Sequence, residues 1–205
     1  MTSLLATLRN LRELRLAHCT EIDDSAFLRL PRGMIFDSLR ILDLTECERV
    51  GDSSIQYIVN AAPRLRNLVL AKCRSITDRS VMAICNLGKN LHYVHLGHCS
   101  NITDTAVKEL VRYCNRIRYI DLACCERLTD ASVQQLATLP KLRRIGLVKC
   151  RSITDKSILA LARPRTSSSH PVWVSSLERV HLSYCVNLQP KVSAHFPLFI
   201  HVVFS

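Results

Sequence analysis

The sequence predicts an α/β solenoid of about seven stacked repeats, with a parallel sheet on its concave face and helices on its convex face. Two observations predict this fold. A nine-residue motif, LxxLxLxxC or a close variant, occurs seven times, and most copies are followed by a Thr-Asp pair and then by apolar residues at helical spacing. The seven motifs end at Cys19, Cys47, Cys73, Cys99, Cys125, Cys150 and Cys185.

The spacing of the apolar positions in the motif is that of leucine-rich repeats, in which Asn or Cys fills the ninth position. Alternate side chains of a strand face opposite ways. We therefore expect Leu68 and Leu70 in the core, and Asn67 and Val69 on the outer face. No repeat can bury its leucines alone, so neighbouring repeats must supply one another's core.

A helix is expected after each turn that follows the motif cysteine. Thr-Asp pairs stand where these helices should begin, at positions 77–78, 103–104, 129–130 and 154–155. An Asp at a helix start can accept hydrogen bonds from free backbone N–H groups and suits the positive end of the helix dipole. Val107, Leu110 and Val111 then have the spacing of a helix face that packs on the sheet.

The repeat pattern divides the chain into two parts. Residues 1–188 are expected to form the solenoid, with an inserted loop at 163–176 that is rich in serine and proline. Residues 189–205 are expected to be a non-repeat tail, because the motif and the Thr-Asp pair are missing there. The abrupt start and the apolar tail suggest a fragment of a longer protein, since terminal repeats need polar caps.

Composition narrows the class of protein. Basic residues outnumber acidic ones, giving a net charge of +11 that favours anionic partners. No apolar run approaches the ~18 residues of a membrane helix, and residues 1–8 lack the basic region and the cleavage signal that are typical of a signal peptide. We expect a cytoplasmic or nuclear protein in which the ten cysteines are reduced and the motif cysteines act as small core residues.

The sequence gives little support to catalysis or to a cofactor. The motifs of serine hydrolases, P-loop proteins and zinc peptidases are absent, and the chain has only five glycines. Cys124 is the one cysteine expected on the outer face of a strand, where an incidental surface cysteine is the simpler interpretation. His92, His95, His98 and Cys99 lie close together in the sequence, but a zinc site is not expected there because their side chains should point in different directions. We expect no enzyme activity, no metal and no cofactor.

The concave face is the candidate binding surface, because broad concave sheets of this kind usually bind a partner. Aromatic, histidine and basic side chains gather at its outward positions, which suits a binding hot spot. Arg144, Lys149 and Arg179 are expected on two neighbouring strands, with His181 beside them and no carboxylate on those two strands. The predicted substrate-binding residues are Arg15, Lys72, Tyr93, His95, His98, Tyr119, Arg144, Lys149, Arg179, His181 and Tyr184.

A second basic feature precedes the strands. The residue after the first motif position is Arg12, Arg40, Arg66, His92, Arg118 and Arg143 in the first six repeats. A solvated edge and an anion-binding edge are equally compatible with this pattern. Nucleic acid is the less favoured partner, because no aromatic residues alternate with the basic ones in this ladder.

The phrases LGHCSNITDTAV, IRYIDLACCERLTDASV and LRRIGLVKCRSITDKSI resemble the cysteine-containing repeats of F-box proteins, in particular those of the fungal glucose-repression group. The resemblance covers residues 4–188. It implies a substrate receptor of an SCF ubiquitin ligase, in which the repeats hold an acidic or phosphorylated protein and an F-box recruits the ligase adaptor. No F-box is recognisable in this sequence, so the adaptor would bind elsewhere in the full protein. The alternative is a free-standing repeat scaffold or inhibitor.

Overall fold

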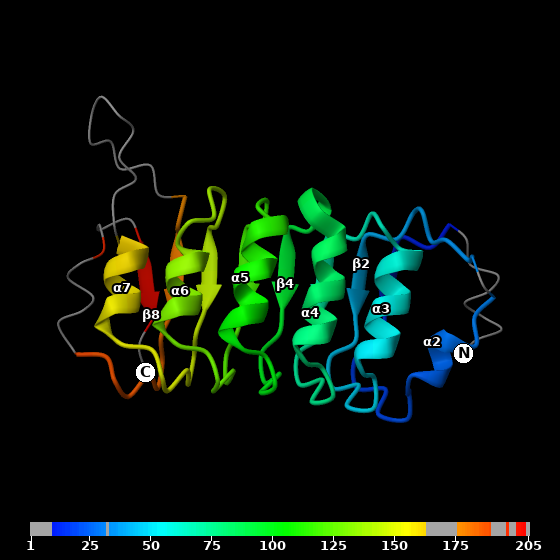
Figure 1. Ribbon diagram of the computed structural model, residues 1–205, viewed down its shortest axis with the longest axis horizontal. Helices are drawn as coiled ribbons and strands as arrows, with labels where there is room; N and C mark the ends of the chain where they lie inside the picture. The colour runs from blue at the N-terminus through cyan, green and yellow to red at the C-terminus, as the bar shows by residue number, and fades with distance from the viewer. Residues whose placement is uncertain (1–9, 32, 163–175, 190–195, 197–199, 204–205) are drawn as a thin grey trace.

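The computed structural model describes residues 10–31, 33–162, 176–189, 196 and 200–203. Eight short parallel strands form one sheet in strict chain order, and helices lie on one side of it (Figure 1). The strands are β1 (Glu13–Arg15), β2 (Ile41–Asp43), β3 (Asn67–Val69), β4 (Tyr93–His95), β5 (Tyr119–Asp121), β6 (Arg144–Gly146), β7 (Arg179–His181) and β8 (His201–Val203). The predicted α/β leucine-rich-repeat solenoid is confirmed.

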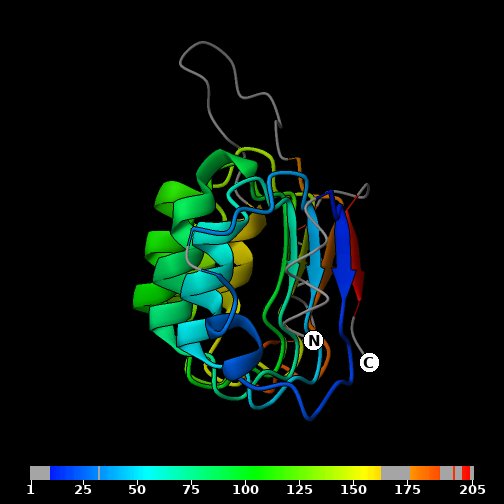
Figure 2. The same cartoon turned by 90° about the vertical axis from the view of Figure 1, so that its right-hand side faces the viewer.

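The helices line the convex side and leave the other face of the sheet uncovered (Figure 2). They are α2 (Ser25–Leu28), α3 (Asp52–Ala61), α4 (Asp78–Ile84), η1 (Cys85–Asn90), α5 (Asp104–Tyr113), α6 (Asp130–Leu136) and α7 (Asp155–Ala162). The middle residue of each strand from β2 to β7 is buried between sheet and helices, as Leu68 and Ile120 illustrate. One continuous apolar core therefore runs through all the described repeats.

The motif cysteines join neighbouring repeats by hydrogen bonds. The Cys73 thiol donates to the backbone oxygen of Leu44 at 3.0 Å, and the Cys99 thiol donates to that of Leu70 at 3.1 Å. Four further motif cysteines make the same bond to the preceding repeat, namely Cys47, Cys125, Cys150 and Cys185. Cysteine suits this position because its small side chain fills the core and still supplies a weak donor.

The aspartates of the Thr-Asp pairs have a different role from the predicted one. At α4 the helix cap is Thr77, whose hydroxyl accepts a hydrogen bond from Arg79 N–H, and Asp78 is the first helical residue. The Asp78 carboxylate instead accepts bonds from the backbone N–H and hydroxyl of Thr103 in the next repeat, at 2.8 and 2.6 Å. The prediction that these aspartates cap their own helices is wrong, and they tie successive repeats together.

The residue before each motif cysteine has a left-handed backbone. All seven have φ between 57° and 65°, although none is glycine. This conformation turns the chain sharply from strand to loop, and it leaves these side chains at the margin of the concave face. The residues are His18, Glu46, Lys72, His98, Cys124, Lys149 and Tyr184.

The sheet continues beyond the seventh motif. Strand β8 pairs in parallel with β7, with His201 beside Arg179 and Val202 beside Val180. Phe196 and Ile200 are buried just ahead of it. The sequence predicted seven strands, because this eighth strand has neither the motif cysteine nor a Thr-Asp pair. Of the predicted loop at 163–176, all but Ser176 lies outside the described residues, as do most of residues 189–205.

Candidate binding surface

Three rows of side chains cross the concave face, because the strands pair in exact register. The row at the third motif position reads Glu13, Ile41, Asn67, Tyr93, Tyr119, Arg144, Arg179 and His201. The row at the fifth position reads Arg15, Asp43, Val69, His95, Asp121, Gly146, His181 and Val203. The left-handed residues form the third row. The predicted binding residues lie in these rows, and their role in binding stays a prediction.

At the N-terminal end of this face the cations are neutralised by carboxylates. Arg15 pairs with Glu13, and its Nη1 lies 3.7 Å from Asp43 Oδ2. Lys72 pairs with Glu46, whose other oxygen lies 2.6 Å from His18 Nδ1. These charges already have partners, so Arg15 and Lys72 are weaker candidates for holding an anion than the sequence suggested.

The centre of the face is an aromatic platform. The rings of Tyr93 and Tyr119 stack with centroids 4.2 Å apart and planes 1° apart. The Tyr119 hydroxyl donates to Asp121 Oδ2 at 3.1 Å, and burial and the Asp121 carboxylate raise the pKa of Tyr119. His95 Nδ1 accepts a hydrogen bond from Gly97 N–H at 3.2 Å. Two stacked rings, of which Tyr119 has its hydroxyl held by Asp121, thus offer a rigid apolar contact.

Asp121 is accommodated by a glycine on the next strand. A Cβ atom added to Gly146 would lie only 2.6 Å from Asp121 Oδ2. The carboxylate occupies that space and also accepts a bond from Ala123 N–H at 2.9 Å. Gly146 is the sequence signal for this arrangement, because a glycine within a strand is a recognised sign of close approach by a neighbour, but Asp121 and Gly146 were not among the predicted site residues.

The C-terminal end carries the least compensated positive charge of the face. Lys149 Nζ lies 5.3 Å from the centroid of the Tyr184 ring, a cation–π contact, and the Tyr184 side chain is exposed. Arg144 and Arg179 are adjacent in register and both exposed. His181 lies in the same strand as Arg179, two residues further on, and is partly buried.

Two residues at this end were missed in the sequence analysis. Glu178 Oε2 lies 4.0 Å from Arg144 Nε, and its other oxygen lies 3.5 Å from Arg143 Nη1. Strands β6 and β7 contain no carboxylate, but Glu178 immediately precedes β7 and partly neutralises Arg144. His201 continues the row beyond Arg179. It was missed because the last strand lacks the repeat motif.

The described residues hold no group of three or more His, Cys, Asp or Glu side chains arranged to bind a metal ion. Within the same part of the chain, no helix has the length and apolar character needed to cross a membrane. Cys124 is partly exposed, and burial raises its pKa, which makes the thiol a weaker nucleophile than a free cysteine. His98 is exposed in its left-handed turn.

Comparison with known proteins agrees with the architecture. A family model described as Leucine Rich repeat matches residues 7–26 and 38–59. Over 56 residues, 27% of this chain, the sequence is 45% identical to the SCF E3 ubiquitin ligase complex F-box protein pof2 of Schizosaccharomyces pombe, and the match covers 10% of that protein.

Two solved structures share the fold at 20% sequence identity. A chain in the yeast Rad7–Elc1 complex aligns with a TM-score of 0.69 over 89% of this chain and 44% of that one. Internalin C2 of Listeria monocytogenes aligns with a TM-score of 0.62 over 98% of this chain and 74% of that one. The chain thus matches about a tenth of the F-box protein and less than half of the Rad7–Elc1 chain. These findings identify the chain as a leucine-rich-repeat solenoid, similar over part of its length to an F-box protein.

Proposed function

We propose that this chain is the substrate-recognition region of an SCF-type ubiquitin-ligase receptor. Its repeats resemble those of the F-box proteins of the fungal glucose-repression group. The local similarity to an F-box protein supports the ligase assignment. Recruitment of the ligase adaptor would need an F-box elsewhere in the longer protein. The chain itself would hold the substrate without catalysing the transfer, in the cytoplasm or nucleus.

The substrate would be an acidic or phosphorylated protein segment bound at the C-terminal half of the concave face. One observation carries this proposal: Tyr93, Tyr119, Arg144 and Arg179 are consecutive members of one row on neighbouring strands. A segment lying along this row would place an apolar residue on the stacked rings and an anion between the two arginines. Arginine suits the anion because its planar guanidinium can bind phosphate through two hydrogen bonds.

Two details of the surface set the direction and strength of such binding. A hydrogen bond to a charged group contributes ~1.5–3 kcal/mol, so two of them could make a phosphate necessary. Glu178 competes with the ligand for Arg144, which favours a doubly charged phosphate over a single carboxylate. Toward the other end of the sheet the three carboxylates of Glu13, Asp43 and Glu46 outnumber the two cations Arg15 and Lys72 that pair with them, so this end would repel the acidic end of the segment.

The test is a titration with an acidic peptide that carries one serine and, beside it, an apolar residue to lie on the stacked tyrosine rings. The peptide is used with its serine phosphorylated and unmodified. Each form is titrated against wild type and against an Arg144→Glu, Arg179→Glu variant. We expect preference for the phosphorylated peptide and a loss of at least about tenfold in the variant. The matched control is Arg127→Glu, Arg151→Glu, which makes the same charge change at exposed arginines in the turns after the motif cysteines. Equal affinity for both peptides, or equal losses in both variants, would refute the concave-face proposal.

The alternative is a free-standing repeat scaffold or inhibitor, which would use the same concave face without an F-box. The two are separated by purifying the full-length protein from cells and probing for the ligase adaptor. Copurification that depends on a segment outside this chain supports the receptor, whereas its absence supports the scaffold.

A further inference from the structure

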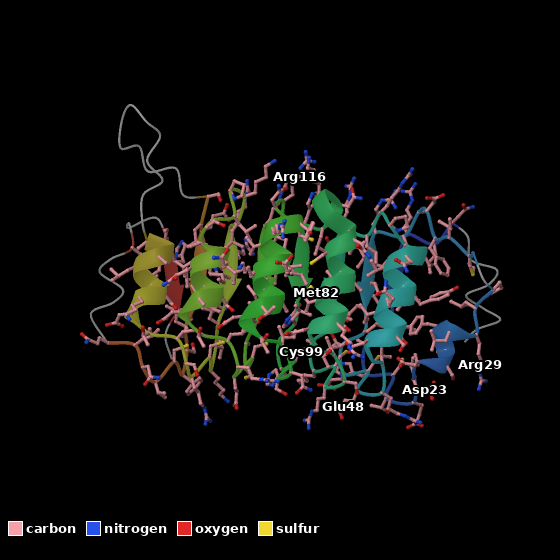
Figure 3. The ribbon with its side chains drawn as sticks, viewed as in Figure 1. Asp23, Arg29, Glu48, Met82, Cys99 and Arg116 are labelled. Atoms are coloured by element: carbon pink, nitrogen blue, oxygen red, sulfur yellow. The ribbon has the colours of Figure 1, made fainter. Side chains whose placement is uncertain are left out.

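We propose a second binding surface on this chain, at the edge of the sheet where the strands begin, which takes an extended acidic segment of a protein. This basic edge consists of Arg66, Lys89, Arg116, Arg118 and Lys141, which are all exposed, around the half-buried His92. It is distinct from the concave face, since none of these residues belongs to the three rows. In Figure 3, Arg116 lies at the upper edge of the solenoid and Glu48 at the opposite one.

The charges of the basic edge are uncompensated. Among the residues that the structure describes, none of its five cations lies within 4.0 Å of a carboxylate oxygen. Arginines to either side of it are paired: Arg64 Nε lies 3.9 Å from Asp37, and Arg143 Nη1 lies 3.5 Å from Glu178. The five unpaired cations of the basic edge lie in the stretches that precede β3 to β6, in the middle of the molecule.

The backbone holds three members of the edge at a fixed spacing. The N–H of His92 donates to the oxygen of Arg66 at 2.9 Å, and the N–H of Arg118 donates to the oxygen of His92 at 2.8 Å. The N–H of Arg143 continues the series to Arg118, also at 2.8 Å. Each residue is therefore about one strand spacing, ~4.8 Å, from the next. The three members of the edge, Arg66, His92 and Arg118, therefore span about 10 Å, which about three residues of an extended chain can follow at ~3.3 Å each.

The positive charges of the basic edge converge on the side chain of His92. Its pKa is lowered by burial, and then by the charges of Arg118, Arg66, Arg116 and Lys141. These four cations come from the stretches preceding three different strands, yet all of them act on one imidazole. An anionic segment laid along the edge would offset this repulsion, so its binding would raise the pKa of His92.

The choice of an acidic protein segment over nucleic acid rests on the aromatic residues. Single-stranded nucleic acids are held by several aromatic side chains on which successive bases stack. In the described part of this edge the exposed aromatic is Tyr113 at the end of α5, and Arg112 already lies over its ring at 5.4 Å. One covered ring is a poor platform for a row of bases, whereas carboxylates need only the cations.

The probe is a fluorescent, end-capped peptide of about eight glutamates, long enough to cover the edge. We expect it to bind wild type, more weakly as salt rises from ~50 to ~150 mM, and to lose at least about tenfold in an Arg116→Glu, Arg118→Glu variant. Both side chains are exposed, so folding should survive, which circular dichroism verifies. The Arg127→Glu, Arg151→Glu variant should bind within about twofold of wild type, because it changes the same charge at another edge.

Three further measurements test the proposal: a variant of the concave face, an NMR titration of His92 and a comparison with single-stranded DNA. Arg144→Glu, Arg179→Glu should leave peptide binding at the edge intact, so failure of the concave-face proposal and failure of this one are distinguishable. In a histidine NMR titration the pKa of His92 should rise when the peptide is added. Equal losses in all three variants, an unmoved His92, or tighter binding of an oligothymidylate of equal length would each overturn the proposal, the last in favour of nucleic acid.

Discussion

The carboxylate of Asp104 is bonded to Thr129 in the next repeat, 25 residues further along the chain. It accepts the backbone N–H of Thr129 at 2.9 Å and the hydroxyl at 2.6 Å, and it also accepts the hydroxyl of the fully buried Ser132. Asp52, two repeats earlier, and Asp130, one repeat later, make the same three contacts with the repeats that follow them. These carboxylates form a ladder along the solenoid that couples each helix start to the next.

The first prediction is that Asp104→Ala destabilises the protein by about 2–3 kcal/mol, more than the ~1 kcal/mol of an ordinary helix cap. The reason is that the change leaves a buried hydroxyl and a backbone N–H without their charged acceptor. Chemical denaturation measures the free energy of unfolding. Asp104→Asn is the control, and it should cost less because an amide oxygen can still accept. Equal costs for the two variants would contradict the inter-repeat role.

The second prediction is that Ala106→Ser stabilises the protein by ~0.5–1 kcal/mol. Ala106 stands where the other repeats have Ser54, Ser80, Ser132 and Ser157, each of which is buried and bonded to the preceding aspartate. Asp78 therefore lacks the serine bond that its counterparts receive. The matched change Ser132→Ala should destabilise by a similar amount. A loss of stability in Ala106→Ser would show that the site does not accept a hydroxyl.

The third prediction concerns acid. Burial raises the pKa values of Asp52, Asp104 and Asp130, but the hydrogen bonds from the serine and threonine of the next repeat outweigh it and lower them below the ordinary 3.8. A folded-state pKa below the unfolded one gives stability that is present above the unfolded pKa and is lost as pH falls through the folded one. Stability should therefore drop steeply below pH ~4. An Asp52→Asn, Asp104→Asn, Asp130→Asn variant should lose less between pH ~5 and ~3, and an unchanged slope would contradict this origin.

The fourth prediction is that all ten cysteines are free thiols and that most are inert in the folded protein. Burial raises the pKa of Cys99 to about 12, and that of Cys150 likewise to about 12. Only Cys19 and Cys124 are partly exposed. A thiol reagent should therefore modify at most these two rapidly, and all ten after denaturation without reductant. A denatured count of six or fewer, or stoichiometric zinc in the purified protein, would refute this state.

The repeat architecture was predictable because its signals are local and periodic. The motif alone placed Leu68 in the core and Tyr93 and Tyr119 on the open face, since alternation within a strand decides both. The partner of Asp104 was not predictable, because a Thr-Asp pair suits a helix cap equally well and the bond crosses to another repeat. Strand β8 has the sheet pairing without the motif cysteine. The pairing of Arg144 with Glu178 depends on the conformations of long side chains, which the sequence does not specify.

The last prediction concerns Gly146 on β6. Gly146→Ala would bring a Cβ within 2.6 Å of Asp121 Oδ2 and 2.7 Å of its carboxyl carbon. Asp121 is held by Ala123 N–H and the Tyr119 hydroxyl, so it cannot move without breaking one of these bonds. We expect a loss of about 1–3 kcal/mol in the free energy of unfolding, together with a lower pKa for Tyr119, since the Asp121 carboxylate is one of the groups that raise it.

A double-mutant cycle isolates this contact. Asp121→Ala removes the clashing carboxylate, so adding Gly146→Ala in that background should cost little. Gly97→Ala is the comparison, because the Cβ there would meet the end of the His95 ring at 2.8 Å, and a side chain whose ring accepts one hydrogen bond, from Gly97 N–H, can shift more readily than the Asp121 carboxylate. Its cost should be smaller than that of Gly146→Ala. If Gly146→Ala cost the same with and without the Asp121 carboxylate, the glycine would be required for another reason. In that case Gly146 on β6 would not help to hold Asp121 in place. The orientation of the Tyr119 ring, which Asp121 fixes and on which the proposed apolar contact depends, would then be independent of β6.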